Sequence, residues 1–143
     1  MFERYTEKAR RAIFFARYEA GRVGASAIDT EHLLLGLLRE ENSILSRFFP
    51  AQASVDSLRR QIERRLLFRQ VIPTSVEIPL SKEAKHVLRL AAEEADSLSH
   101  RAIMPEHLLL GLFGEPDSLG AKVLRENGVE YTVVRQEVEK NAT

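Results

Sequence analysis

The sequence repeats itself at an offset of 75 residues. The segment TEHLLLGLLRE at residues 30–40 recurs as PEHLLLGLFGE at residues 105–115. Of the 44 gapless pairs from Thr6/Ser81 to Phe49/Leu124, 15 are identical, whereas average composition gives roughly three by chance. The chain is therefore an internal duplication, and its fold has to be built from two similar halves.

Each repeat carries apolar residues at helical spacing. The two stripes are Ala9, Ile13, Ala16 and Ala20, and Ala84, Leu88, Ala91 and Ala95. This spacing predicts one amphipathic helix per repeat, and its small residues predict that a second helix packs very close. The leucine-rich segment that follows has no polar face, so it predicts a short buried helix at the centre of each repeat. Pro105 fits the first turn of the second copy.

Two further helices are predicted in each repeat. Residues 43–49 and 118–127 suit a third helix, the latter closed by Gly128. A fourth helix is expected from the apolar spacing of residues 55–66 and 131–138. We therefore expect a single all-α domain over 1–143, a duplicated four-helix repeat of about eight helices with pseudo-twofold symmetry. Repeat one covers 1–68, an extended connector with two prolines covers 69–80, and repeat two covers 81–143.

Composition limits the classes of partner and of chemistry. The 21 basic and 21 acidic residues give zero formal net charge, which does not favour a nucleic-acid or membrane partner. The chain has no cysteine, which excludes disulfides, thiolate zinc sites and cysteine nucleophiles. The N-terminal residues MFERYTEKARR lack an apolar signal core, so the expected location is cytoplasmic.

The duplicated motifs resemble a known family. FERYTEKARRAI followed by TEHLLLGLLRE, and repeated once, is similar to the Clp amino-terminal domain of ClpA/ClpC-type AAA+ unfoldases, closest to the ClpC branch. The resemblance implies a non-enzymatic domain that docks protein substrates and adaptor proteins ahead of the ATPase rings of a Clp unfoldase and protease assembly. It also implies recognition of clients that carry phosphoarginine.

The seven glycines form no G-x-x-x-x-G-K-[ST] phosphate loop. No cofactor is therefore expected in this chain, and ATP would belong only to the AAA+ rings of a longer protein. The alternative is a stand-alone Clp-repeat regulatory protein that holds adaptors or clients without an ATPase.

The resemblance also implies ligand-binding positions. Residues of this chain that match its phosphoarginine-binding positions are Thr6, Glu31, Ser81 and Glu106, and Ser81 stands where the pattern has threonine. From the residues themselves we infer that Arg10 and Lys85, each four positions after a hydroxyl, contact the phosphate. The alternative for both glutamates is stabilisation of a helix N-terminus. Two sites, one per repeat, are expected.

His32 and His107 directly follow these glutamates. A hydrolase that uses each Glu–His pair is a third hypothesis, but two separated copies without a nucleophile favour duplicated binding. A metal site is not expected, because each helix carries one histidine rather than an i, i+4 pair. Both rings are expected to make local hydrogen bonds and to pack beside leucines.

Two candidate partner surfaces complete the set. Arg59, Arg60 and Arg64 form a basic helix face, which is solvated by default and which contacts an acidic adaptor as the alternative. Phe2 and Tyr5 precede the first helix and are expected to present an apolar rim to a partner.

Overall fold

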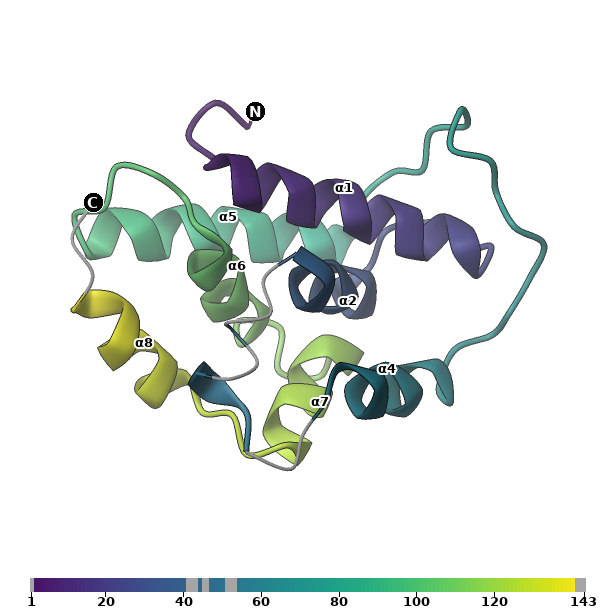
Figure 1. Ribbon diagram of the computed structural model, residues 1–143. Helices are drawn as coiled ribbons and strands as arrows, with labels where there is room; N and C mark the ends of the chain where they lie inside the picture. Colours follow the sequence, from purple (N-terminus) through teal and green to yellow (C-terminus); the bar gives the residue numbers. More distant parts are fainter. Residues whose placement is uncertain (1, 41–43, 45–46, 51–53, 141–143) are drawn as a thin grey trace.

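The computed structural model describes residues 2–40, 44, 47–50 and 54–140, and this part of the chain is helical without a strand (Figure 1). The all-α prediction is confirmed for it. The third helix expected at 43–49 lies partly outside the described residues. The named helices are α1 (Glu7–Arg22), α2 (Thr30–Glu40), α4 (Val55–Glu63), α5 (Lys82–Ser97), α6 (Pro105–Leu112), α7 (Leu119–Glu126) and α8 (Tyr131–Glu139).

Local capping residues set the helix boundaries. The hydroxyls of Thr6 and Ser81 each accept a hydrogen bond from a backbone N–H in the first turn of α1 and α5. Gly24 and Gly128 follow α1 and α7 with φ of 71° and 77°, a conformation that glycine adopts without strain. The prediction that the fourth helix reaches Leu66 is wrong, because α4 ends at Glu63.

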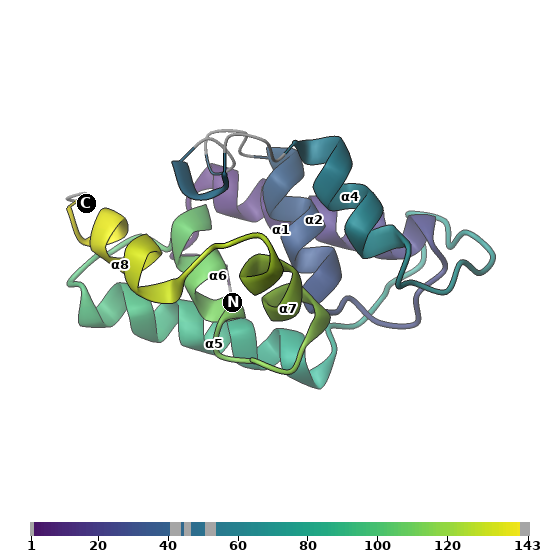
Figure 2. The same cartoon turned by 90° about the horizontal axis from the view of Figure 1, so that it is seen from below.

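Two close helix pairs form the centre of the fold. α1 packs on α2 and α5 packs on α6 (Figure 2). A Cβ atom on Gly36 of α2 would lie 2.3 Å from the carbonyl oxygen of Ala12, and one on Gly111 of α6 would lie 2.5 Å from that of Val87. The close packing expected from the small residues of α1 and α5 is therefore confirmed, since only glycine fits at these crossings.

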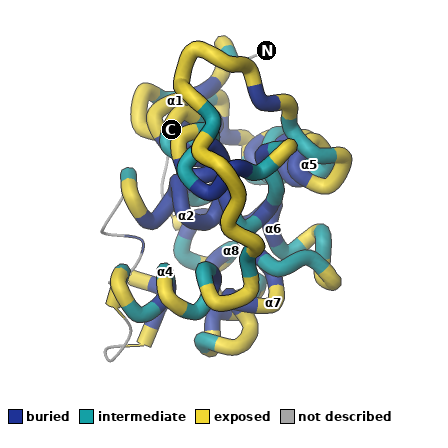
Figure 3. The backbone as a smooth tube through the Cα atoms, turned by 90° about the vertical axis from the view of Figure 1, so that its right-hand side faces the viewer, coloured by how far each residue is buried: buried dark blue, intermediate teal, exposed yellow. Residues whose placement is uncertain are grey.

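The core lies where the leucine-rich helices meet. Leu34 and Leu109 are both 0% exposed, and buried backbone fills the middle of the molecule in Figure 3. Exposed residues gather on the outer faces of α1, α4, α5 and α8. The two short helices without a polar face thus occupy the position that their sequence predicts.

The contacts between the two repeats are themselves duplicated. Tyr5 pairs with Ile103 in one isolated bridge, and Ile28 pairs with Leu80 in the other. Adding 75 to Tyr5 gives Leu80, and adding 75 to Ile28 gives Ile103, so exchanging the repeats converts one bridge into the other. This reciprocity is what a pseudo-twofold axis between the repeats requires.

The connector is attached along the C-terminal end of α1. Backbone N–H groups of Arg69 and Ile72 donate to the carbonyl oxygens of Val23 and Gly21, both at 2.9 Å. The Arg17 guanidinium donates to the carbonyl oxygen of Pro73 at 2.8 Å. Segment 69–80 contains no helix, and it carries the chain from repeat one to the start of α5.

Candidate functional site

The capping residue with the predicted site hydroxyl, Thr6 or Ser81, lies beside the leucine-rich helix of the other repeat. The backbone N–H of Thr6 donates to the carbonyl oxygen of Ile103 at 3.0 Å, just before α6 and Glu106. The N–H of Ser81 donates to the carbonyl oxygen of Ile28 at 2.8 Å, just before α2 and Glu31. The sequence does not reveal this exchange, because an alignment compares the repeats without placing them in space.

The junction around Glu31 is acidic. It brings the first turn of α2 and the N-terminal ends of α5 and α7 around a pocket of about 500 Å³. Five carboxylates line the pocket. Three lie within or just before the first turn of α2 or α5, where N–H groups favour negative charge, and two lie in the α6–α7 loop. The five are Asp29, Glu31, Glu83, Glu115 and Asp117.

Glu31 is half-buried in this junction and has no cationic partner among the described residues. Burial raises the pKa of its carboxyl, and the neighbouring Asp29 raises it further. The hydroxyl of Thr30 lies 3.4 Å from Glu31 Oε1, and Ser81 Oγ donates to Asp29 Oδ1 at 2.9 Å. Among the described residues Glu31 makes no ion pair, so its carboxylate is available to pair with a cationic ligand in the pocket.

Glu106 occupies the matching position but has a partner. Arg47 Nη1 lies 2.9 Å from Glu106 Oε2, and both side chains are partly buried. Met104 takes the place that Asp29 has in repeat one. A guanidinium of the chain itself therefore contacts the second carboxylate, whereas the first is open.

The two proposed phosphate contacts also differ. Arg10 donates to the carbonyl oxygens of Phe2 and Glu3 at 3.3 and 3.5 Å, so its guanidinium is directed toward the N-terminal segment. Lys85 is exposed on α5 and lines a pocket of about 650 Å³ together with Lys82 and Arg89. Glu83 and Glu115 line this pocket too, and they also line the acidic pocket of Glu31.

Both histidines make the local hydrogen bonds expected of them. The backbone N–H of Asp29 donates to His32 Nδ1, and that of Met104 donates to His107 Nδ1, each at 2.9 Å. His107 Nε2 lies 3.0 Å from Nδ1 of the buried His100. These bonds hold each ring against its own helix end, and among the described residues no hydrogen bond joins either ring to the adjacent glutamate.

The basic face of α4 is divided between structure and solvent. Arg59 donates through both terminal nitrogens to Glu19, at 2.9 Å each, and Glu19 is 0% exposed. The expectation that Arg59 is merely solvated is therefore wrong, because a buried carboxylate requires a cationic partner; its contact with a partner protein stays a prediction. Arg60 and Arg64 are exposed and line a shallow pocket of about 470 Å³.

The N-terminal aromatic residues do not form the expected rim. Tyr5 is only 6% exposed, and burial raises the pKa of its phenol to about 12. Phe2 is half-buried and packs edge-on against Tyr5, with ring centroids 4.9 Å apart. The bridge between Tyr5 and Ile103 draws this segment onto repeat two, and a contact between such distant segments cannot be seen from the sequence position alone.

Sequence reasoning missed Arg47, Asp29 and His100. Each of them is a different amino acid from its counterpart at the offset of 75. The counterparts are, in order, Lys122, Met104 and Ala25. Identity between the repeats drew attention to shared residues, whereas the differences between them determine which site is open.

Among the described residues no helix is long and apolar enough to cross a membrane.

Comparison with known sequences gives a family match over almost the whole chain. The profile of the Clp repeat (R) N-terminal domain matches residues 4–127, and a second match covers residues 79–143. A chloroplastic chaperone protein ClpC of Pisum sativum is 40% identical over 139 residues, which are 96% of this chain and 15% of that protein. A ClpA homologue, an ATP-binding subunit of the ATP-dependent Clp protease of Guillardia theta, is also 40% identical, and 17% of it is covered.

Solved structures agree with this match. The N-terminal domain of ClpD from Arabidopsis thaliana has a TM-score of 0.75 and 29% identity, covering 95% of this chain and 92% of that one. The Hsp104 N-terminal domain from Candida albicans has a TM-score of 0.72 at 20% identity, covering 96% of this chain and 91% of that one, and it supports the fold alone. The chain spans less than a fifth of the length of the two sequence relatives named above.

Proposed function

Because this chain belongs to the Clp repeat N-terminal domain family, we propose that it docks protein substrates and adaptors for a Clp-type ATP-dependent unfoldase. We further propose that it binds proteins marked with phosphoarginine at the junction of Glu31 and Ser81. Proteins of this kind act in protein quality control, so the partners of the chain would be client proteins, adaptors and the Clp assembly itself.

The observation that carries the proposal is the open carboxylate of Glu31. A guanidinium ligand needs a planar acceptor, and a partly buried carboxylate without a cation provides one. Ionisation of Glu31 is opposed by burial and by Asp29. An incoming guanidinium would relieve both effects, so binding and ionisation would support each other.

The charges around Glu31 suggest how phosphoarginine lies. The acidic pocket suits the guanidinium and repels the phosphate. The neighbouring pocket shares Glu83 and Glu115 with it and adds Lys82, Lys85 and Arg89. A ligand that bridges the two pockets would place its guanidinium at Glu31 and its phosphate toward the cations on α5, which gives Lys85 the role inferred from its spacing.

Binding explains the site better than catalysis does. Among the described residues no hydrogen bond joins Glu31 to His32, since His32 Nδ1 accepts from the Asp29 backbone and Nε2 has no hydrogen-bond partner. A general acid–base pair would need a side chain within hydrogen-bond reach of the other. The proposed docking function requires no cofactor, and ATP would be used by rings elsewhere in a longer protein. The alternative is a regulatory protein that holds clients without such rings.

The cellular compartment is part of the proposal. The pea relative is named as a chloroplastic protein, and we propose the cytoplasm for this chain. Location of a tagged full-length protein by microscopy would test this point separately from ligand binding.

Calorimetry with free phosphoarginine tests the ligand. We expect binding to the wild type, and Glu31→Gln should weaken it by ~1.5–3 kcal/mol because one charge-assisted pair is lost. Arginine alone and inorganic phosphate alone should each bind more weakly than phosphoarginine. Glu83→Gln is the matched control, since it removes an acidic residue of the same pocket without removing the buried one. Absence of phosphoarginine binding to the folded wild type would refute the ligand.

A further inference from the structure

The imidazole of His32 holds a hydrogen-bond donor that has no acceptor. The Asp29 backbone N–H donates to Nδ1 at 2.9 Å, so a neutral ring carries its proton on Nε2. Burial lowers the pKa of His32, which keeps the ring neutral. The side chain is 3% exposed, and Nε2 has no hydrogen-bond partner in the described structure. A buried N–H without an acceptor is unfavourable, because its hydration is lost and no hydrogen bond replaces it.

Repeat two shows what normally satisfies this nitrogen. There, Nε2 of His107 meets Nδ1 of His100 at 3.0 Å. The residue that matches His100 in repeat one is Ala25, and the backbone N–H makes the matching hydrogen bond at the two positions. The Ala25 N–H donates to the carbonyl oxygen of Ala20 at 2.9 Å, and the His100 N–H donates to the carbonyl oxygen of Ala95 at 2.8 Å. Alanine at this position therefore offers no acceptor where repeat two has the second imidazole.

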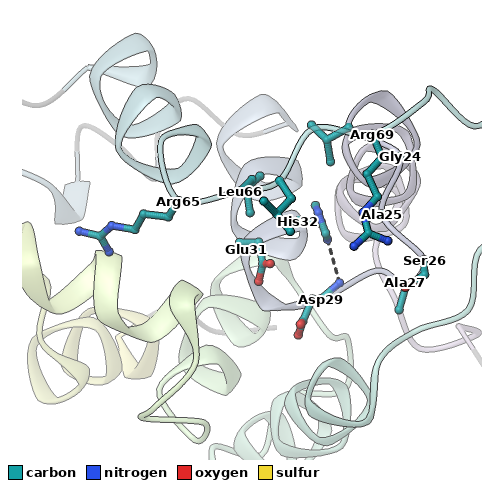
Figure 4. A pocket seen from close by; sticks show the side chains of 12 residues that line it. Gly24, Ala25, Ser26, Ala27, Asp29, Glu31, His32, Arg65, Leu66 and Arg69 are labelled. Carbon is teal, nitrogen blue, oxygen red and sulfur yellow. Dashed lines mark hydrogen bonds between the residues drawn. The ribbon is translucent and has the colours of Figure 1, made fainter.

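A pocket lies beside His32 and Ala25. It has a volume of about 310 Å³, and Ala25, His32 and Arg69 are among the residues that line it (Figure 4). The backbone N–H of Arg69 bonds to the carbonyl oxygen of Val23, but its guanidinium has no partner among the described residues. Arg65 extends away toward α7, where it pairs with Glu126 at 2.5 Å.

We propose that this pocket binds a carboxylate. One oxygen of the carboxylate accepts from His32 Nε2–H, and its charge is balanced by the guanidinium of Arg69. Asp29 and Glu31 also line the pocket, and they favour a single negative charge over the two of a phosphate. Since Nε2 is covered in the unliganded chain, side chains that line the pocket shift slightly on binding. This pocket shares Asp29 and Glu31 with the acidic pocket of the guanidinium site, but the carboxylate would be held by His32 and Arg69, so the proposal does not rest on phosphoarginine binding.

The carboxylate can come from a free small acid or from the C-terminus of a protein. Acetate serves as the first probe. A short peptide with a free C-terminal carboxylate and the same peptide with an amidated C-terminus serve as the second and third, and inorganic phosphate as the fourth. A response to the free but not to the amidated peptide, stronger than the response to acetate, would identify a protein terminus. A response to acetate alone would identify small acids.

NMR of the histidine side chains tests the site directly, because each imidazole nitrogen has its own chemical shift. On titration with acetate we expect the Nε2 signal of His32 to move, while that of His107, whose partner is His100, stays in place. Arg69→Gln should weaken binding by about fivefold, the factor that corresponds to an ion pair of ~1 kcal/mol. Ala25→His should abolish the response, since the new imidazole fills the pocket and accepts from His32.

Two results would overturn the proposal. One is a His32 signal that stays fixed at the highest concentrations of both acetate and the free peptide. The other is a phosphate response that exceeds the acetate response. Should Ala25→His fail to fold, as judged by its melting curve, the comparison between the wild type and Arg69→Gln decides, and equal affinity of the two for acetate would count against the site.

Discussion

Arg47 Nη1 lies 2.9 Å from Glu106 Oε2 and joins the segment after α2 to the first turn of α6. The residue that matches Arg47 in repeat two is Lys122, which is exposed on α7. Glu31 makes no ion pair among the described residues. Two glutamates in nearly identical sequences therefore have different surroundings, and a duplicated motif does not produce two equivalent sites.

The first prediction concerns the number of phosphoarginine sites. The sequence predicts two, but the ion pair of Glu106 leads us to expect one strong site in the wild type, at Glu31. Arg47→Ala should free Glu106 and raise the calorimetric stoichiometry to two. Lys122→Ala, the matched change in the other repeat, should leave it at one. Two sites of equal affinity in the wild type would show that Arg47 does not block the second carboxylate.

The second prediction concerns the titration of Glu31. Burial raises the pKa of its carboxyl in the folded protein above the usual 4.5. Ionisation of Glu31 therefore lowers the free energy of unfolding, and this loss is regained as the pH falls through the raised pKa and the carboxyl is protonated. In a carboxyl-carbon NMR titration the midpoint should lie above 4.5 and should fall when a guanidinium ligand binds. A midpoint at or below 4.5 without ligand would contradict the buried, unpaired state.

The third prediction concerns acid unfolding. Burial, and then the neighbouring His100, lowers the pKa of His107 from 6.5 to about 4. The unfolded chain binds this proton at a higher pH than the folded chain, so stability is lost as the pH falls from about 6.5 toward 4. The loss from His107 should approach ~3 kcal/mol. Urea unfolding across this range should show a smaller pH dependence for His107→Gln, and an unchanged dependence would exclude His107 as its source.

The fourth prediction concerns the core. Leu34 and Leu109 are 0% exposed, so replacing either with alanine should cost ~2–5 kcal/mol through lost burial and the cavity left behind. Leu67, which is 76% exposed, provides the control, and Leu67→Ala should change the free energy of unfolding by less than about 0.5 kcal/mol. Similar losses for all three variants in denaturant unfolding would contradict this account of the core.

The fifth prediction separates the arginines of α4. Arg59→Ala removes a bidentate partner from the buried Glu19, and it should lower the free energy of unfolding by ~1–3 kcal/mol. The loss is limited because Arg22 and Arg39 also contact Glu19. Arg60→Ala should change stability by less than about 0.5 kcal/mol. If Arg60 and Arg64 contact an acidic adaptor, reversing both to glutamate should weaken its binding most strongly at low salt.

Much of the fold follows from the sequence because it depends on local patterns. Small residues at helical spacing required close helix packing, and Gly36 and Gly111 lie where backbones meet. Leucine-rich segments without a polar face could only be buried. Pro105 marked the start of α6, and Gly128 marked the end of α7. In each case residues within one or two turns provide the signal, and a single sequence contains them.

The arrangement of the site was decided by contacts between distant segments. Thr6 lies beside the segment leading to Glu106, and Ser81 lies beside the one leading to Glu31, because the repeats pack reciprocally. Arg47 reaches Glu106 across 59 residues. The sequence by itself determined two helical halves and which residues they share. Only the tertiary structure decided which carboxylate is paired and which is open, since charge pairing depends on distance in space and not on position in the chain.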